Sequence, residues 1–142
     1  MKVVALLVLV LGLVPACDRL FRASSDSSAP DVRRGERLYN QYCLSCHGGP
    51  TGGSMMDYPP RHNARGHTWH HPDCQLREII KNGGDEMTAM MRRMMAPPNA
   101  PTMPAFRDVL TDEDVDSILA FIKGWWTAEQ RDFQAQVTQS RC

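Results

Sequence analysis

The sequence predicts an all-α domain. Three stretches space their apolar residues three and four positions apart, as one face of an amphipathic helix does, and they cover about residues 31–42, 72–82 and 111–126. Each stretch also carries a capping or stop signal at an end. With 142 residues in all, and an N-terminal leader and linker to subtract, the chain has room for one small domain of about a hundred residues.

The first and last of these helices should contact each other. Asp31 can cap a helix that runs to Tyr42, and Gly35 on its apolar face would let a second helix approach closely. Thr111 is followed by three acidic residues, which is typical of a helix start, and an apolar stripe follows. We therefore expect the helix that begins at Thr111 to cross the first helix.

Three further segments carry helix signals. The stretch 72–82 ends at Gly83-Gly84, a common helix stop. The run from Met87 to Met95 has helical propensity and is broken by Ala96-Pro97-Pro98, so it predicts a short inserted helix. Thr127 to Gln130 forms a capping box, which predicts a short C-terminal helix and a frayed tail within residues 127–142.

The chemistry of the chain centres on Cys43-Leu44-Ser45-Cys46-His47. Two cysteines three apart with a histidine directly after the second are the attachment motif of haem c. Residues i and i+3 share one face of a helical turn, so both thiols can form thioethers with one porphyrin edge while His47 binds the iron. The alternatives are a turn with a chance histidine, or a zinc site built with His71 and Cys74.

The N-terminal segment is interpreted as a targeting signal. Lys2 and the apolar run 3–14 are typical of a signal peptide, and at about 18 Å the run is too short for a membrane of about 30 Å. Val14-Pro15-Ala16-Cys17 resembles a bacterial lipobox, which predicts a signal peptide over 1–16 and a lipidated Cys17. The serine-rich residues 17–30 then form a flexible linker. We expect export to the periplasm or to the outer face of the cytoplasmic membrane.

Charge and the remaining cysteines add two constraints. Sixteen basic and sixteen acidic side chains balance, which argues against nucleic acid as a partner. An exported chain enters an oxidising compartment, where free thiols are seldom available to bind zinc. This argues against the zinc alternative. Cys74 and Cys142 remain after the other assignments, and the sequence leaves their pairing open.

From about residue 31 to 126 the chain resembles class I monohaem cytochromes c. The matching residues are Gly35, Tyr39, the segment 43–48, Met103-Pro104-Ala105-Phe106, and Leu110 to Val115 leading into Ile118 to Ile122. This resemblance implies three or more helices around one haem c. It also implies electron transfer between a redox donor and an acceptor, in place of enzymatic bond-making.

By resemblance, Met103 is the second axial ligand of the iron, because the family's methionine precedes the last helix and is commonly followed by proline. Pro101 and Pro104 stiffen this loop, which lowers the entropy lost in holding the sulfur. Met94 and Met95 are the rival ligands. An open sixth position would instead indicate a haem enzyme or a gas-binding sensor.

Four residues are candidates for the surroundings of the haem. By resemblance, the backbone carbonyl of Pro59 or Pro60 accepts the other ring N–H of the proximal histidine, which would orient the ring. Arg61 and Trp69 could donate to haem propionates, and Trp69 could equally belong to the core.

Histidines and methionines also gather outside the haem motif. His62, His67, His70 and His71 form one cluster, and five methionines lie three and four apart between Met87 and Met95. Imidazole and thioether are both copper ligands, so copper handling is a further hypothesis. The alternative is that the methionines fill the core and that the histidines lie at the surface or near the propionates.

Overall fold

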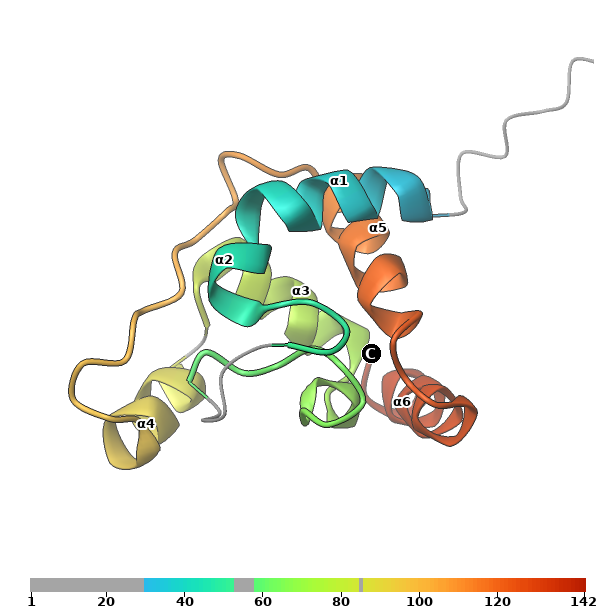
Figure 1. The fold of residues 1–142 in the computed structure, drawn as a ribbon. Helices are drawn as coiled ribbons and strands as arrows, with labels where there is room; N and C mark the ends of the chain where they lie inside the picture. The colour runs from blue at the N-terminus through green and yellow to red at the C-terminus, as the bar shows by residue number, and fades with distance from the viewer. Residues whose placement is uncertain (1–29, 53–57, 85) are drawn as a thin grey trace, which may run out of the picture.

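The computed structural model describes residues 30–52, 58–84 and 86–142, and every regular element in these ranges is helical. The all-α prediction is therefore confirmed. The elements are α1 (Val32–Tyr42), α2 (Leu44–His47), η2 (Thr68–His70), α3 (Asp73–Asn82), α4 (Glu86–Met95), α5 (Asp112–Lys123) and α6 (Ala128–Arg141) (Figure 1). Among these helices, none is both long enough and apolar enough to cross a membrane. The predicted signal peptide, Cys17 and the linker up to residue 29 lie outside the described residues.

The close crossing of α1 over α5 is the main contact of the fold (Figure 1). It occurs at Gly35, where an added Cβ would lie 1.9 Å from the carbonyl oxygen of Ser117. Only a residue without a side chain lets the two backbones come this near. The glycine on the apolar face of the first predicted helix therefore sets the distance between α1 and α5.

The hydrophobic core fills the space beneath this crossing. Its buried members are Tyr39, Leu76, Leu110, Val115, Ile118, Leu119, Ile122 and Trp126. Tyr39 is 1% exposed, and its ring packs edge-on against Trp125 at a centroid distance of 5.0 Å. Half of these residues, Val115, Ile118, Leu119 and Ile122, come from α5, in agreement with the apolar stripe predicted after Thr111.

Capping residues hold the two crossed helices at their starts. The Asp31 carboxylate accepts hydrogen bonds from the backbone N–H groups of Arg33 and Arg34, so Asp31 caps α1 as predicted. Thr111 and Asp114 form a capping box at the start of α5. The Arg34 guanidinium donates to the same Asp114 carboxylate at 2.6 Å, which ties α1 to α5.

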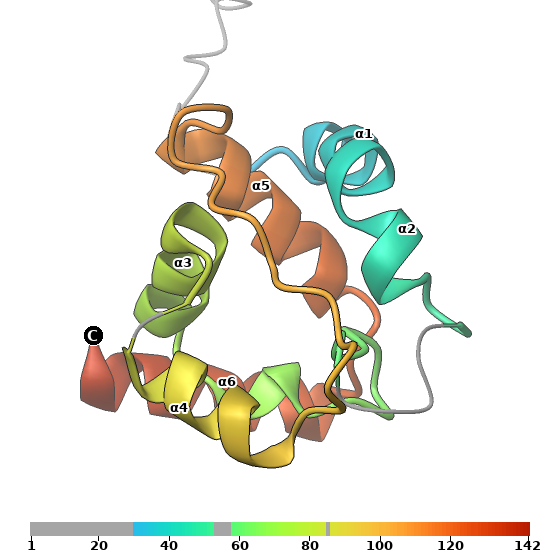
Figure 2. The same cartoon turned by 90° about the vertical axis from the view of Figure 1, so that its left-hand side faces the viewer.

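Helix α3 begins after Pro72 and ends at Gly83, as the sequence predicts. Gly83 has φ +76°, the left-handed conformation that favours glycine. Just before this end, the carbonyls of Ile80 and Lys81 accept hydrogen bonds from the backbone N–H groups of Phe106 and Arg107. These bonds hold the loop over residues 96–110, which runs from α4 to α5 (Figure 2).

Helix α6 is longer than predicted. It starts with the expected capping box at Thr127 and runs to Arg141, so the predicted frayed tail is wrong. The sequence pattern underestimated α6 because its stability comes from tertiary contacts. Buried Gln134 donates to the Asp73 carboxylate at 2.7 Å, and a disulfide joins Cys142 to Cys74 in the first turn of α3.

Helix α4 confirms the short helix predicted over the methionine run. It lies at the end of the molecule opposite α1 in both views (Figures 1 and 2). None of its described side chains is buried. This helix is therefore peripheral, and its methionines do not fill the core of this structure.

Candidate functional site

The junction of α1 and α2 presents two thiols one helical turn apart. Cys43 closes α1 and also caps α2, and its carbonyl accepts hydrogen bonds from the backbone N–H groups of Cys46 and His47. Neither thiol is in a disulfide, and Cys46 is exposed while Cys43 is half-buried. Burial, together with the nearby Cys46, raises the pKa of the Cys43 thiol to about 11. The backbone of this segment thus forms the helical turn that the motif spacing requires.

His47, the last residue of α2, is buried and has its ring orientation fixed. Its Nδ1 lies 2.7 Å from the carbonyl oxygen of Pro60, so Nδ1 carries the proton and donates. Burial lowers the pKa of His47, and the hydrogen bond to Pro60 partly opposes that effect. A neutral imidazole with a protonated Nδ1 has its lone pair on Nε2, which is the form that binds a metal.

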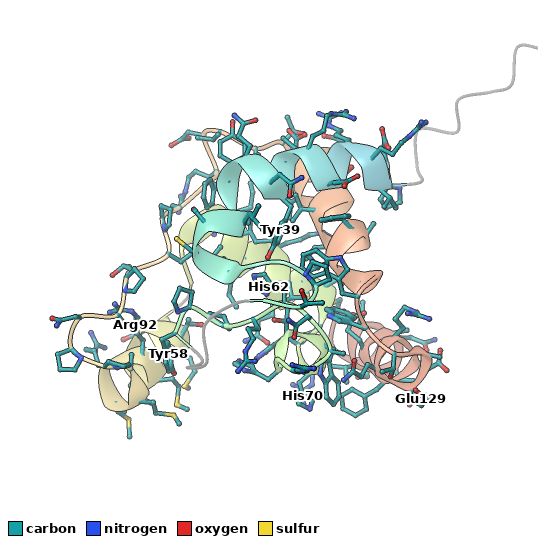
Figure 3. All side chains as sticks on the ribbon, in the orientation of Figure 1. Tyr39, Tyr58, His62, His70, Arg92 and Glu129 are labelled. Carbon is teal, nitrogen blue, oxygen red and sulfur yellow. A yellow bond between two sulfur atoms is a disulfide. The ribbon has the colours of Figure 1, made fainter. Side chains whose placement is uncertain are left out.

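A second histidine, His62, packs against His47. The two rings stack with centroids 4.1 Å apart and an angle of 25° between their planes. His62 Nδ1 lies 2.8 Å from the Thr68 hydroxyl, and the ring lies below Tyr39 in the interior of the molecule (Figure 3). Burial holds the pKa of His62 well below its ordinary value. The sequence grouped His62 with the other histidines and did not indicate this contact.

Polar contacts fold the loops on either side of the motif against it. The Tyr39 hydroxyl donates to the carbonyl of Gly48 at 2.7 Å, directly after His47. Buried Asn63 donates from Nδ2 to the carbonyl of Gly52 at 3.0 Å, and its Oδ1 accepts from the backbone N–H of Arg65. Asn63 therefore ties the segment after the motif to the segment that follows Pro60. The sequence analysis did not single out this asparagine.

The two tryptophans nearest this loop use their indole N–H groups on backbone carbonyls. Trp126 donates to His62 at 2.8 Å, and Trp69 donates to Gly66 at 2.9 Å. The Trp69 ring also packs against Phe133 of α6. In this structure Trp69 is a packing residue with its donor engaged, which corresponds to the core alternative. The backbone carbonyl of Arg61 accepts from the Thr68 hydroxyl at 3.2 Å.

The donor set fits a covalently attached haem c. Two unpaired thiols lie on one turn, and the adjacent histidine presents Nε2 while its Nδ1 is engaged. The alternative zinc set loses a ligand because Cys74 is disulfide-bonded. Among the described residues, no group of three or more histidine, cysteine, aspartate or glutamate side chains is arranged to hold a metal ion.

Comparison with known protein families agrees with a haem c site. The family model described as "Cytochrome C oxidase, cbb3-type, subunit III" matches residues 30–122, which contain α1 to α4 and all but the last residue of α5. The chain belongs to this cytochrome c family. No individual curated protein matches the chain significantly. The family implies covalently bound haem c, electron transfer and redox partners, in agreement with the resemblance noted in the sequence.

Met103 of this cytochrome c domain lies in the loop between α4 and α5 and is half-buried. Its backbone packs against the end of α3, where a Cβ on Gly83 would lie 2.9 Å from the Met103 carbonyl oxygen. Together with the hydrogen bonds from Phe106 and Arg107 to α3, this contact fixes the path of the loop on both sides of Pro104.

The predicted histidine cluster is divided between different environments. His62 stacks on His47, whereas the His70 ring lies 3.6 Å from Trp69 and near the edge of the molecule (Figure 3). His67 and His71 contact each other with ring centroids 5.6 Å apart. Among the described residues, these histidines form no group of three or more with one another, with cysteines or with carboxylates that could hold a metal ion.

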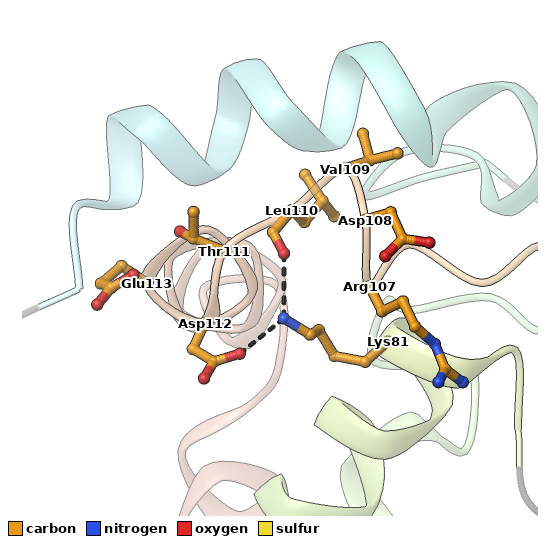
Figure 4. Close-up of a pocket in the computed structure, with 8 residues that line it drawn as sticks. All are labelled: Lys81, Arg107, Asp108, Val109, Leu110, Thr111, Asp112 and Glu113. Atoms are coloured by element: carbon orange, nitrogen blue, oxygen red, sulfur yellow. Dashed lines mark hydrogen bonds and ion pairs between the residues drawn. The ribbon is translucent and has the colours of Figure 1, made fainter.

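A shallow pocket elsewhere on the surface has a structural explanation. It is lined by Lys81, Arg107, Asp108, Val109, Leu110, Thr111, Asp112 and Glu113 (Figure 4). Lys81 donates across it to the carbonyl of Leu110 at 3.1 Å and to the Asp112 carboxylate at 2.7 Å. These bonds fasten the end of α3 to the start of α5, and we assign this pocket no separate function.

Proposed function

We propose that the protein is an exported one-electron carrier with one haem c, held by Cys43 and Cys46 and ligated by His47 and Met103. The observation that carries the proposal is the hydrogen bond from His47 Nδ1 to the Pro60 carbonyl beside two free thiols. A fixed, neutral proximal imidazole next to a thiol pair serves haem attachment and has no obvious use in a purely structural turn.

Each residue has a defined task in this proposal. Cys43 and Cys46 supply the two thioether sulfurs, and their fixed helical spacing sets the orientation of the porphyrin edge. Pro60 keeps the His47 ring in one orientation and raises its basicity as a ligand. When bound, haem c supplies the ferric and ferrous states between which one electron is exchanged. With both His47 and Met103 holding the iron, no position would be left for a substrate, which favours electron transfer.

Met103 is proposed as the second axial ligand because its loop is restrained on both sides. The contact with Gly83 and the hydrogen bonds to the end of α3 restrict the backbone, and Pro104 removes further freedom. A preorganised loop loses less entropy when its thioether binds a metal. A thioether opposite histidine stabilises the ferrous state and raises the reduction potential.

The optical spectrum of the ferric protein tests this ligand. Methionine sulfur on ferric haem gives a weak long-wavelength charge-transfer band, which we expect in the parent protein and not in Met103→Ala. Met94→Ala and Met95→Ala are the matched controls, and both should keep the band. Persistence of the band in Met103→Ala would show that another residue is the ligand.

We also propose that the mature chain begins at a lipidated Cys17 and remains on the outer face of the membrane. The support is the apolar run 3–14 followed by Val14-Pro15-Ala16-Cys17. Expressed in a bacterial host, the parent should fractionate with membranes and carry a modified N-terminal cysteine by mass spectrometry. Cys17→Ser should be soluble or unprocessed. An unmodified N-terminus in the parent would refute the lipid anchor.

A further inference from the structure

Helix α4 carries its apolar face outward, which is the reverse of an ordinary amphipathic helix. At about 100° per residue its five methionines occupy an arc of about 140°. All five are exposed: Met87 60%, Met90 42%, Met91 42%, Met94 73% and Met95 64%. Arg92 lies on the opposite side, is half-buried, and donates to the carbonyl of Ala100. The polar side of α4 therefore faces its own loop, and the thioethers face solvent.

An exposed apolar helix face is unfavourable in water, and such a face usually marks a binding site. Five large apolar side chains on ten residues form a continuous patch in contact with water, and none of them contributes a buried side chain to the fold. A chance surface would be expected to contain leucine or polar residues at some of these positions. The uniform choice of the thioether at all five positions points to the chemistry of sulfur.

The i, i+3, i+4 spacing that allows three sulfurs to converge occurs twice on α4, at Met87, Met90 and Met91 and at Met91, Met94 and Met95. Met91, Met94 and Met95 are related as i, i+3 and i+4, so their Cβ atoms lie about 5–6 Å apart on one face. Methionine has three rotatable bonds beyond the backbone, which lets three sulfurs converge on one point without moving the helix. Met94 and Met95 lie in the last turn of α4, where the partial negative charge of the helix end favours a cation and the side chains of Arg92 and Arg93 oppose it.

We propose that Met91, Met94 and Met95 bind Cu(I). Neutral thioethers are soft ligands that suit the reduced ion and discriminate against hard divalent ions such as Mg²⁺ and Ca²⁺. The proposed site contains no histidine: His62 is stacked on His47, His70 packs against Trp69, and His67 and His71 contact each other. This inference rests on the proposed function in one respect, since it requires Met103 to be the haem ligand and Met94 and Met95 to be free.

The test is a competition titration of Cu(I) against a chromophoric Cu(I) chelator, performed anaerobically on the reduced, haem-loaded protein. We expect the parent to take one equivalent of Cu(I) from the chelator. Met91→Leu, Met94→Leu and Met95→Leu should each weaken binding at least about tenfold. Leucine matches methionine in size and helix propensity, so these variants remove the sulfur and leave the helix intact.

Two control variants make the result specific. Met87→Leu lies on the same face of α4 outside the triad and should bind Cu(I) within about threefold of the parent. A combined His67→Leu, His70→Leu and His71→Leu variant should also bind as the parent does. The proposal is overturned if the parent holds no more Cu(I) than the triple Met91→Leu, Met94→Leu, Met95→Leu variant, or if the histidine variant alone loses binding.

The ferric haem spectrum of the same variants separates this inference from the proposed function. Loss of Cu(I) binding in Met94→Leu or Met95→Leu with an unchanged methionine-to-iron band supports the copper site. Loss of that band in either variant would instead make that residue a haem ligand, and would overturn both the copper triad and the assignment of Met103.

Discussion

Asp114 is the residue that joins the starts of α1 and α5. Its carboxylate accepts from the Arg34 guanidinium at 2.6 Å and from the backbone N–H of Thr111 at 3.0 Å. Burial raises the pKa of this carboxyl, but the hydrogen bonds from Arg34 and Thr111 outweigh that effect and hold the pKa below its ordinary value of 3.8. The stabilising form is therefore the ionised one.

Asp114→Asn tests this link through its pH dependence. A lowered folded-state pKa stabilises the protein above the unfolded-state value of 3.8, and that contribution is lost as the pH falls through the folded-state pKa. We expect Asp114→Asn to lower the free energy of unfolding by about 1 kcal/mol at pH 7, and the difference from the parent to vanish in acid. Urea unfolding of both proteins at several pH values measures this difference in the free energy of unfolding. A difference independent of pH would contradict an electrostatic role for Asp114.

The chemistry of single residues was partly visible in the sequence. The cysteine and histidine spacing predicted a turn with both thiols on one side, and the cap at Asp31 is confirmed. The stacking of His62 on His47 and the buried Asn63 could not be predicted, because both depend on how the loop after Pro60 folds back. Loop conformation leaves no periodic pattern in a sequence. Such contacts require the tertiary structure.

At the scale of the elements, the crossing of α1 and α5 decides whether the site is assembled. Helix α1 leads directly into α2, so the position of the thiols and His47 depends on where α1 lies on α5. Gly35 allows the contact, because any Cβ there meets the Ser117 carbonyl. A shift of the crossing would move the whole motif relative to the loop that carries Met103.

Gly35→Ala should therefore destabilise the protein more than an ordinary glycine substitution. With the new Cβ placed 1.9 Å from the Ser117 oxygen, the helices must separate, and we expect a loss of about 3 kcal/mol in the free energy of unfolding. Gly49→Ala is the matched control, since its nearest neighbour would be the Leu44 side chain at 3.8 Å. Denaturant unfolding should show little change for Gly49→Ala. Equal losses of stability in Gly35→Ala and Gly49→Ala would contradict the claim that the α1–α5 contact requires a glycine at position 35.

Most of the helices were predictable from the sequence, and α6 is the exception. Capping or stop signals and apolar spacing located α1, α3 and α5 close to their observed bounds, and helical propensity with a following proline break located α4. A short C-terminal helix followed by a frayed tail was predicted where α6 runs to Arg141. Helix α6 is held instead by buried Gln134 and by the disulfide between Cys142 and Cys74. The sequence left that pairing open, because a partner 68 residues away leaves no local signal.

For the whole molecule, segments distant in sequence meet around the α1–α2 junction. Helix α5 supports α1, the loop after Pro60 orients His47, and the end of α3 holds the loop of Met103. Helix α6 packs against η2 and α3, whereas α4 lies apart from α6 with its methionines exposed (Figure 1). The fold thus places a fixed imidazole and two thiols at one site and leaves a separate thioether face at the periphery.

The intact mass of the purified protein under denaturing conditions tests the central claim most directly. Thioether bonds survive denaturation, so the parent should exceed a Cys43→Ser, Cys46→Ser double variant by the mass of one haem, after correction for the two substitutions. The same lipid or signal processing affects both proteins and cancels in the comparison. A parent that releases its haem on denaturation, or that carries more than one, would contradict the account of this site.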